Sequence, residues 1–191
     1  MTTPDRRADA ESRLRRAFDS LQAARALLAV EPPLRDDAVN RASAAALNAA
    51  RALVGAQWAK ISQNGWDPTW RPGMSRPPDA VGIDRHSRQA YDKLLDRFQL
   101  LAAGAGLPED FILYLRALVD DGFEADAGET PEYDGEESDG AVETAMRLVA
   151  AVAEQLSMGA EFRARVAAFP GSENAATTDE SRPLLAVVRD P

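Results

Sequence analysis

The sequence of 191 residues contains no cysteine, which excludes disulfides, thiolate zinc sites, iron–sulfur clusters and cysteine nucleophiles. Aromatic residues make up only 6% of the chain while hydrophobic residues make up 45%, so small aliphatic side chains must fill the core. No apolar run reaches the length of about eighteen residues that a transmembrane helix needs, and no apolar segment follows the N-terminus. The sequence therefore predicts no membrane span and no secretory signal, and the expected location is the cytoplasm.

Histidine occurs once, as His86, so a metal site built from histidines is not expected, because zinc takes several nitrogen or sulfur ligands. A calcium loop also fits poorly. With Gly135 or Gly140 at the glycine position of such a loop, its terminal glutamate would fall on Ala141 or Met146. Glycine-rich dinucleotide motifs, phosphate loops and nucleophile elbows are absent from the sequence. We therefore expect neither a metal ion nor a cofactor.

Lysine is nearly absent as well, and abundant alanine and arginine indicate a GC-rich bacterial genome. The net charge of −9 is unevenly spread, because residues 118–145 hold eleven acidic side chains and no basic one. The rest of the chain is therefore nearly neutral, and the broad basic field of a nucleic-acid-binding protein is missing. Residues 120–138 are predicted to form a solvated acidic loop, with binding of a basic partner or mimicry of nucleic-acid charge as the functional alternatives.

Hydrophobic residues recur at helical spacing along most of the chain. The predicted stripes lie within residues 14–28, 39–61, 91–101, 111–119 and 142–156, with a short further helix near 162–169. Asp36 or Asp37 is predicted to cap the second helix, and Ser138 or Asp139 the fifth. The expected fold is all-α, an up-and-down bundle of about five helices over residues 1–169, followed by a flexible tail over 170–191.

Residues 63–82 interrupt the bundle with a proline- and tryptophan-rich insert. Trp66 and Trp70 lie there close to Arg71 and Arg76, residue types that stack on bases and hold phosphates, or anchor a protein interface. The structural alternative is that both indole rings pack on the bundle.

Two stretches together resemble HEPN domains, prokaryotic helical bundles often encoded beside minimal nucleotidyltransferases. The first is the alanine-rich segment from Asn40 to Val54, which is similar to the second helix of the family. The second runs from His86-Ser87 through Gly106-Leu107-Pro108 to the acidic element at 124–128. The resemblance covers roughly residues 10–157, with the insert as an interruption.

The resemblance implies a homodimer with a polar cleft between its subunits. Many HEPN proteins are metal-independent ribonucleases that use an arginine and a histidine with four to six residues between them. The imidazole transfers the proton of the attacking 2′-hydroxyl, and the arginine stabilises the phosphate. In the branch paired with nucleotidyltransferases, the comparable element often reads Arg-x-x-Ala-Asp-Tyr.

This sequence departs from both versions. Asp79, Ala80 and Val81 precede His86 where the arginine would stand, and only Asp126 remains of the branch's element. In the second helix, Asn48 stands at the position of the family's histidine, and Ser43 and Ala44 replace its aromatic pair. The ribonuclease site is therefore predicted to be degenerate. For Asn48 and Asn40 we expect a hydrogen bond to another helix or to another subunit, with a place in a ligand cleft as the functional alternative.

Three functions remain open at this point. The first is a HEPN-like, non-catalytic binding or scaffold module of a bacterial toxin–antitoxin or defence-type system, with a protein partner such as a nucleotidyltransferase-type antitoxin. The second is a ribonuclease toxin in which His86 is the acid/base and Arg85 or Arg88 holds the RNA phosphate, whereas the structural alternative makes His86 a surface or capping residue. The third is a small helical subunit of a larger assembly.

Overall fold

The computed structural model describes residues 3–57, 88–126 and 132–168. These residues form helices and contain no strand, which confirms the all-α class. The helices are α1 (Thr3–Leu28), α2 (Arg35–Ala56), α4 (Arg88–Ala105), α5 (Asp110–Asp126), α6 (Gly135–Gln155) and α7 (Gly159–Ala167).

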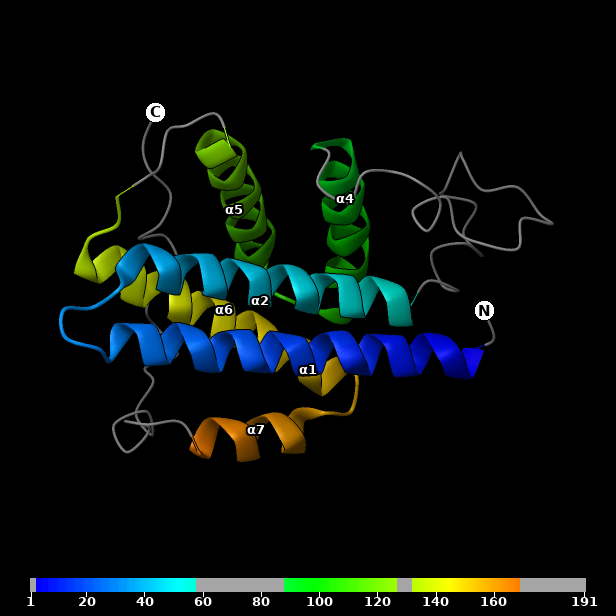
Figure 1. The fold of residues 1–191 in the computed structure, drawn as a ribbon. Coiled ribbons are helices and arrows are strands. Elements are labelled where there is room, and N and C mark those ends of the chain that lie inside the picture. The colour runs from blue at the N-terminus through cyan, green and yellow to red at the C-terminus, as the bar shows by residue number, and fades with distance from the viewer. Residues whose placement is uncertain (1–2, 58–87, 127–131, 169–191) are drawn as a thin grey trace.

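The helices are arranged around the antiparallel pair α1 and α2, as Figure 1 shows. Helix α6 packs behind this pair, and α7 lies along the side of α1 that faces away from α2. Helices α4 and α5 stand upright on the other side, across α2 and not alongside it. The α1–α2 pair and the α4–α5 pair are thus each up-and-down, but the second pair crosses the first instead of lying parallel to it as in a simple bundle.

Alanine forms much of the surface on which α2 packs. The alanines of α2 with no exposed surface are Ala38, Ala42, Ala45, Ala46, Ala49, Ala50 and Ala52. Helix α1 contributes Ala17 and Ala24, which are buried just as completely, and such small side chains allow two helix axes to approach closely. Larger buried side chains, among them Phe18 and Phe98, fill the remaining core. The alanine-rich face of α2 is therefore covered within one chain.

The start of α2 differs from the sequence prediction. The N-cap position is held by Leu34, whose side chain makes no capping bond, while Asp36 and Asp37 lie in the first helical turn. Leu34 is fixed by its backbone instead, because its N–H donates to the carbonyl oxygen of Leu27 across the turn at 3.0 Å. The two carboxylates stabilise the helix through its dipole.

The start of α6 also differs. Asp134, not Ser138 or Asp139, is the N-cap: its carboxylate accepts from the N–H of Glu137 at 2.8 Å, and the Glu137 carboxylate accepts from the N–H of Asp134 at 3.0 Å. Residues 135–138 are therefore helical. At the other side, α5 extends to Asp126, so the acidic loop predicted for residues 120–138 is helical at both of its ends. A reciprocal capping box explains this earlier start, because it satisfies two N–H groups of the first turn together.

The junction between α6 and α7 is a tight cap. Ser157 has a φ of 61°, and the N–H of Met158 donates back to the carbonyl oxygen of Ala153 at 2.7 Å. This is the geometry in which glycine usually ends a helix. The nearby Gly159 does not take this role, because it is the first residue of α7.

Candidate functional site

Most of the site residues predicted from the sequence, namely Trp66, Trp70, Arg71, Arg76, Arg85 and His86, lie outside the described residues. Of the others, Arg88 is the first residue of α4 and Asp126 the last of α5. Both therefore belong to the outer end of the upright pair, whereas Asn48 lies in the middle of α2. The described structure does not bring these three residues into one site.

Asn48 has a neighbour that the sequence interpretation missed. It is half-buried on α2, and Arg51 follows one helical turn later. The guanidinium carbon of Arg51 lies 5.5 Å from the ring centroid of Tyr91 at the start of α4, a cation–π contact that orients the arginine. Ser43 is turned toward its own helix, where its hydroxyl donates to the carbonyl oxygen of Val39 at 2.8 Å. In the sequence, Asn48 and Arg51 interrupt the alanine run, and that interruption is the signal that could have indicated the pair.

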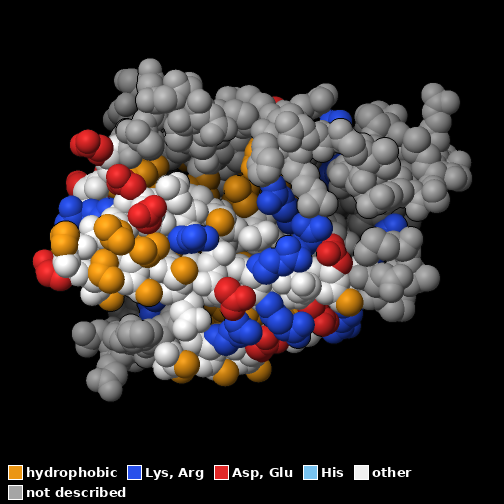
Figure 2. Space-filling model, viewed as in Figure 1, with side chains coloured by type: hydrophobic (Ala, Val, Ile, Leu, Met, Phe, Trp, Pro, Cys, Tyr) orange, Lys and Arg blue, Asp and Glu red, His pale blue; other side chains and the backbone are white. Residues whose placement is uncertain are grey.

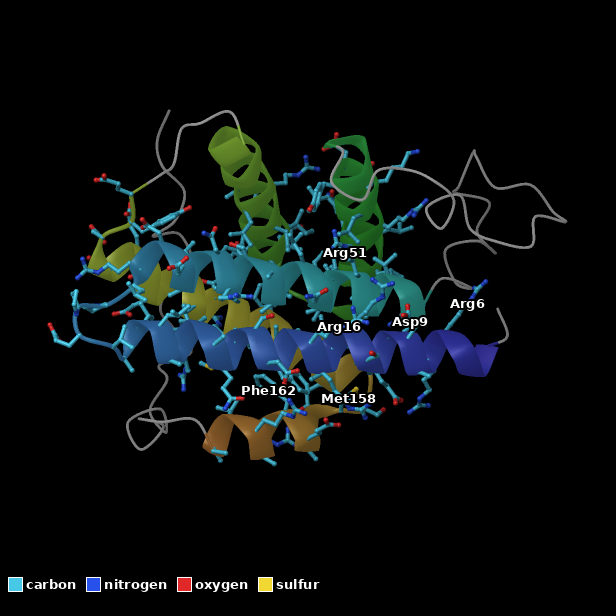
Figure 3. All side chains as sticks on the ribbon, viewed as in Figure 1. Arg6, Asp9, Arg16, Arg51, Met158 and Phe162 are labelled. Atoms are coloured by element: carbon cyan, nitrogen blue, oxygen red, sulfur yellow. The ribbon has the colours of Figure 1, made fainter. Side chains whose placement is uncertain are left out.

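Arginines gather beside this position, on the surface where α1 begins and α2 ends (Figure 2). Positions 6, 9, 13 and 16 share one side of α1 through their spacing of three and four residues. They hold three arginines and Asp9, and Figure 3 shows Arg6, Asp9 and Arg16 along α1, with Arg51 on neighbouring α2. We call Arg6, Arg13, Arg16 and Arg51 the arginine face.

The arginine face keeps a net positive charge after its internal pairing. Asp9 binds Arg13, with 2.8 Å between the carboxylate oxygen and Nε. Arg16 contacts the hydroxyl of Ser12 at 3.5 Å, a neutral partner. Among these five side chains, four guanidinium groups thus stand against one carboxylate. Because guanidinium presents a planar fork of donors, such a surface suits carboxylate or phosphate groups.

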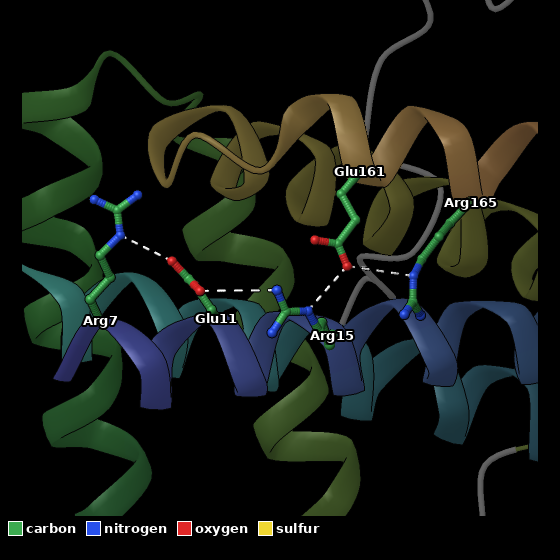
Figure 4. Close-up of polar contacts among 5 residues, drawn as sticks. All are labelled: Arg7, Glu11, Arg15, Glu161 and Arg165. Atoms are coloured by element: carbon green, nitrogen blue, oxygen red, sulfur yellow. Dashed lines mark hydrogen bonds and ion pairs between the residues drawn. The ribbon is translucent and has the colours of Figure 1, made fainter. Parts of the chain in front are cut away.

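A second group of arginines forms ion pairs between α1 and α7 (Figure 4). Glu161 accepts from Nε of Arg15 at 3.1 Å and lies 3.8 Å from Nε of Arg165. The hydrogen bond to Glu161 is the main cause that raises the pKa of Arg15 above its ordinary value. Arg15 is charged at every ordinary pH, as arginine side chains in proteins are.

An apolar contact accompanies these ion pairs. The rings of Phe18 and Phe162 lie 5.2 Å apart, centroid to centroid, and the guanidinium carbon of Arg165 lies 5.5 Å from the centroid of the Phe18 ring. Arg165 also binds Asp19 at 2.6 Å. These contacts give this second group of arginines a structural role, and we do not count it in the arginine face.

Acidic side chains gather at the opposite end of the α1–α2 pair. The N–H of Tyr133 donates to the carboxylate of Asp36 at 3.3 Å, which places the start of α6 beside the first turn of α2. The exposed carboxylates of this acidic end are Glu31, Asp36, Asp37, Glu132, Asp134, Glu136 and Asp139. Part of the charge that the sequence placed in one loop thus lies at the start of α6, next to Asp36 and Asp37 in the first turn of α2, and negative charge is favourable at the start of each helix.

Within residues 3–57, 88–126 and 132–168, none of the helices is long and apolar enough to cross a membrane. Across the same three ranges, no three histidine, aspartate or glutamate side chains are grouped to hold a metal ion.

Comparisons with protein-family models, with curated proteins and with solved structures gave no match. The resemblance to HEPN domains therefore remains a prediction.

Proposed function

We propose that this chain is a HEPN-like helical binding module without hydrolytic activity of its own, which serves as a scaffold partner in a bacterial toxin–antitoxin or defence-type system. The observation that supports it most is the arginine face, a positively charged surface on the long α1–α2 pair beside Asn48. The proposed partner is a protein that presents acidic side chains to this surface.

The chemistry beside Arg51 favours binding over cleavage. An amide such as that of Asn48 donates and accepts hydrogen bonds, but it does not exchange a proton near neutral pH. An arginine beside an amide can therefore hold an anionic group without supplying the acid or base that RNA cleavage requires. The cation–π contact with Tyr91 adds rigidity, so less entropy is lost when Arg51 meets a partner.

The dimer implied by the family resemblance needs a surface other than the alanine face of α2. The alanines of that face have no exposed surface, and α2 contacts α1, α6, α4 and α5 of its own chain. A homodimer is thus proposed only through the outer surfaces of the bundle.

A binding titration with the protein encoded by the neighbouring gene tests the proposal. We expect the double variant Arg6→Glu/Arg16→Glu to weaken binding about 100-fold, because like charges placed across an interface cost several kcal/mol. The matched control is Arg41→Glu/Arg116→Glu, which reverses two exposed arginines outside the arginine face. Absence of binding by the wild-type protein, or equal losses in both variants, would overturn the proposal.

RNA cleavage in the presence of a chelator separates this proposal from the ribonuclease alternative. The wild-type protein and the His86→Ala variant are incubated with RNA in parallel. We expect no cleavage by either protein while both remain helical. Cleavage by the wild type that disappears in the variant would make the protein a ribonuclease.

A further inference from the structure

The turn between α1 and α2 exposes large hydrophobic side chains. Val30 is 43% exposed and Leu34 46% exposed, although each adjoins a helix of the core. Pro32 and Pro33 lie between them, and Ala29 beside Val30 is also exposed. Figure 2 shows hydrophobic side chains gathered at this end of the molecule. We call Val30 and Leu34 the turn patch; its apolar surface would gain free energy if an apolar segment covered it.

Carboxylates surround the turn patch. Glu31 lies within it, and Asp36 and Asp37 follow Leu34 in the first turn of α2. The bond from the N–H of Tyr133 to Asp36 brings the exposed Asp134 to the same place, and Arg35 is the one cation in the turn and first helical turn. An occupant that matches this surface is apolar in its middle and basic at its ends.

The sequence contains one such segment near its C-terminus, outside the described residues. Residues 184–188 are Leu-Leu-Ala-Val-Val, with Arg182 two positions before them and Arg189 directly after them. The linker from 169 to 181 is polar and includes acidic residues, and it has no comparable apolar run. The pattern of residues 182–189 is thus complementary to the turn patch in both polarity and charge.

The chain geometry brings this segment within reach of the turn patch. Helix α7 runs in the same direction as α1, because Glu161 pairs with Arg15 and Arg165 pairs with Asp19. The end of α7 therefore points toward the turn, as Figure 1 also shows. From Asp19 to Val30 the distance along α1 is about 16 Å, at 1.5 Å per residue. The thirteen residues from 169 to 181 span about 20 Å on average as a flexible chain. The effective concentration of residues 182–189 at the turn patch is highest when the mean span of the linker matches the distance to be bridged.

We infer that residues 182–189 bind the turn patch of their own chain, with the apolar residues against Val30 and Leu34 and the two arginines among the surrounding carboxylates. The contact is a reversible cover over a hydrophobic surface at the acidic end. It involves none of the arginine face, so it stands whether or not the proposed function is correct.

The absence of cysteine allows a direct test in the full-length chain. Val30→Cys and Leu34→Cys are made separately, so that each protein keeps the other apolar residue, and the rate of reaction with a maleimide is measured. Arg182→Glu/Arg189→Glu is then added to each. We expect labelling about fivefold faster in the charge-reversed chains. If the segment covers the cysteine about four-fifths of the time, the cysteine reacts at about one-fifth of its uncovered rate, and the arginine reversals restore the full rate.

Two controls make the result specific. Leu113 on α5 is 50% exposed and lies away from the turn, so Leu113→Cys should react at the same rate with or without the arginine reversals. Arg41→Glu/Arg116→Glu should leave labelling at Leu34→Cys unchanged. Equal labelling with and without Arg182→Glu/Arg189→Glu would overturn the inference. Protection that increases with protein concentration would also overturn it, because the segment would then come from a second copy.

Discussion

The dense alanine packing of α2 leads to a specific prediction for Ala46→Leu. Ala46 has no exposed surface, and the residues around it belong to the continuous core. The substitution introduces three extra carbon atoms between helices that are held close by small side chains. The helices must separate or the new side chain must adopt a strained rotamer. The alanine face would then lose packing along its length.

The expected loss is at the upper end of the usual range for overpacked cores, about 3 kcal/mol in the free energy of unfolding. For a chain of this size, such a loss lowers the midpoint of thermal unfolding by about 6–12 °C. The matched control is Ala26→Leu, at an exposed position of α1. Leucine and alanine are both strong helix formers, so we expect the control to change stability by less than about 0.5 kcal/mol.

Thermal and urea unfolding, followed by circular dichroism, measure both variants, and sedimentation gives their oligomeric state. Equal stability of Ala46→Leu and Ala26→Leu would refute the close packing described here. Conversion of a dimer to monomers of unchanged stability by Ala46→Leu would refute it as well, because the alanine face would then be a subunit interface.

Three further substitutions test local features by urea unfolding. Asp134→Ala removes one half of the reciprocal cap with Glu137 and should lower the free energy of unfolding by about 1 kcal/mol. An unchanged free energy of unfolding would contradict the start of α6 described above. Tyr114→Phe removes the buried hydrogen bond from the phenol to the carbonyl oxygen of Ala141 at 2.9 Å and should also cost about 1 kcal/mol; an unchanged midpoint would contradict that bond. Ser157→Gly should stabilise the protein by about 1 kcal/mol, because glycine has no Cβ to strain at a φ of 61°, and a destabilised variant would contradict the described cap.

The buried faces of the helices were predictable from hydrophobic spacing. The stripe predicted within residues 14–28 includes Leu14, Phe18 and Leu21, and all three are buried. Phe162 was expected in a short last helix and packs on Phe18. Such spacing is reliable because a helix with one apolar side must turn that side inward, whatever its neighbours are.

The helix caps were less predictable. The segment around α6 offers several acidic and hydroxyl residues in a row, and each is a good N-cap in isolation. The choice of Asp134 depends on its extended backbone, with φ −79° and ψ −177°, and on the reciprocal bond with Glu137. At α2, the carboxylates of Asp36 and Asp37 that suit a cap lie within the first helical turn, because the N-cap position is held by Leu34, whose N–H is bonded to Leu27.

The sequence by itself determined the all-α class, the buried stripes and the interruptions between helices, because these follow from spacing and from residues with restricted backbones. The tertiary structure decided which helices cover the alanine face, which arginines are used in ion pairs and where the acidic residues meet. Arg15 and Glu161 are 146 positions apart, and Asp36 and Tyr133 are 97 apart. Pairs so distant leave no local pattern in a sequence, since they depend on how the helices pack and not on how each one forms.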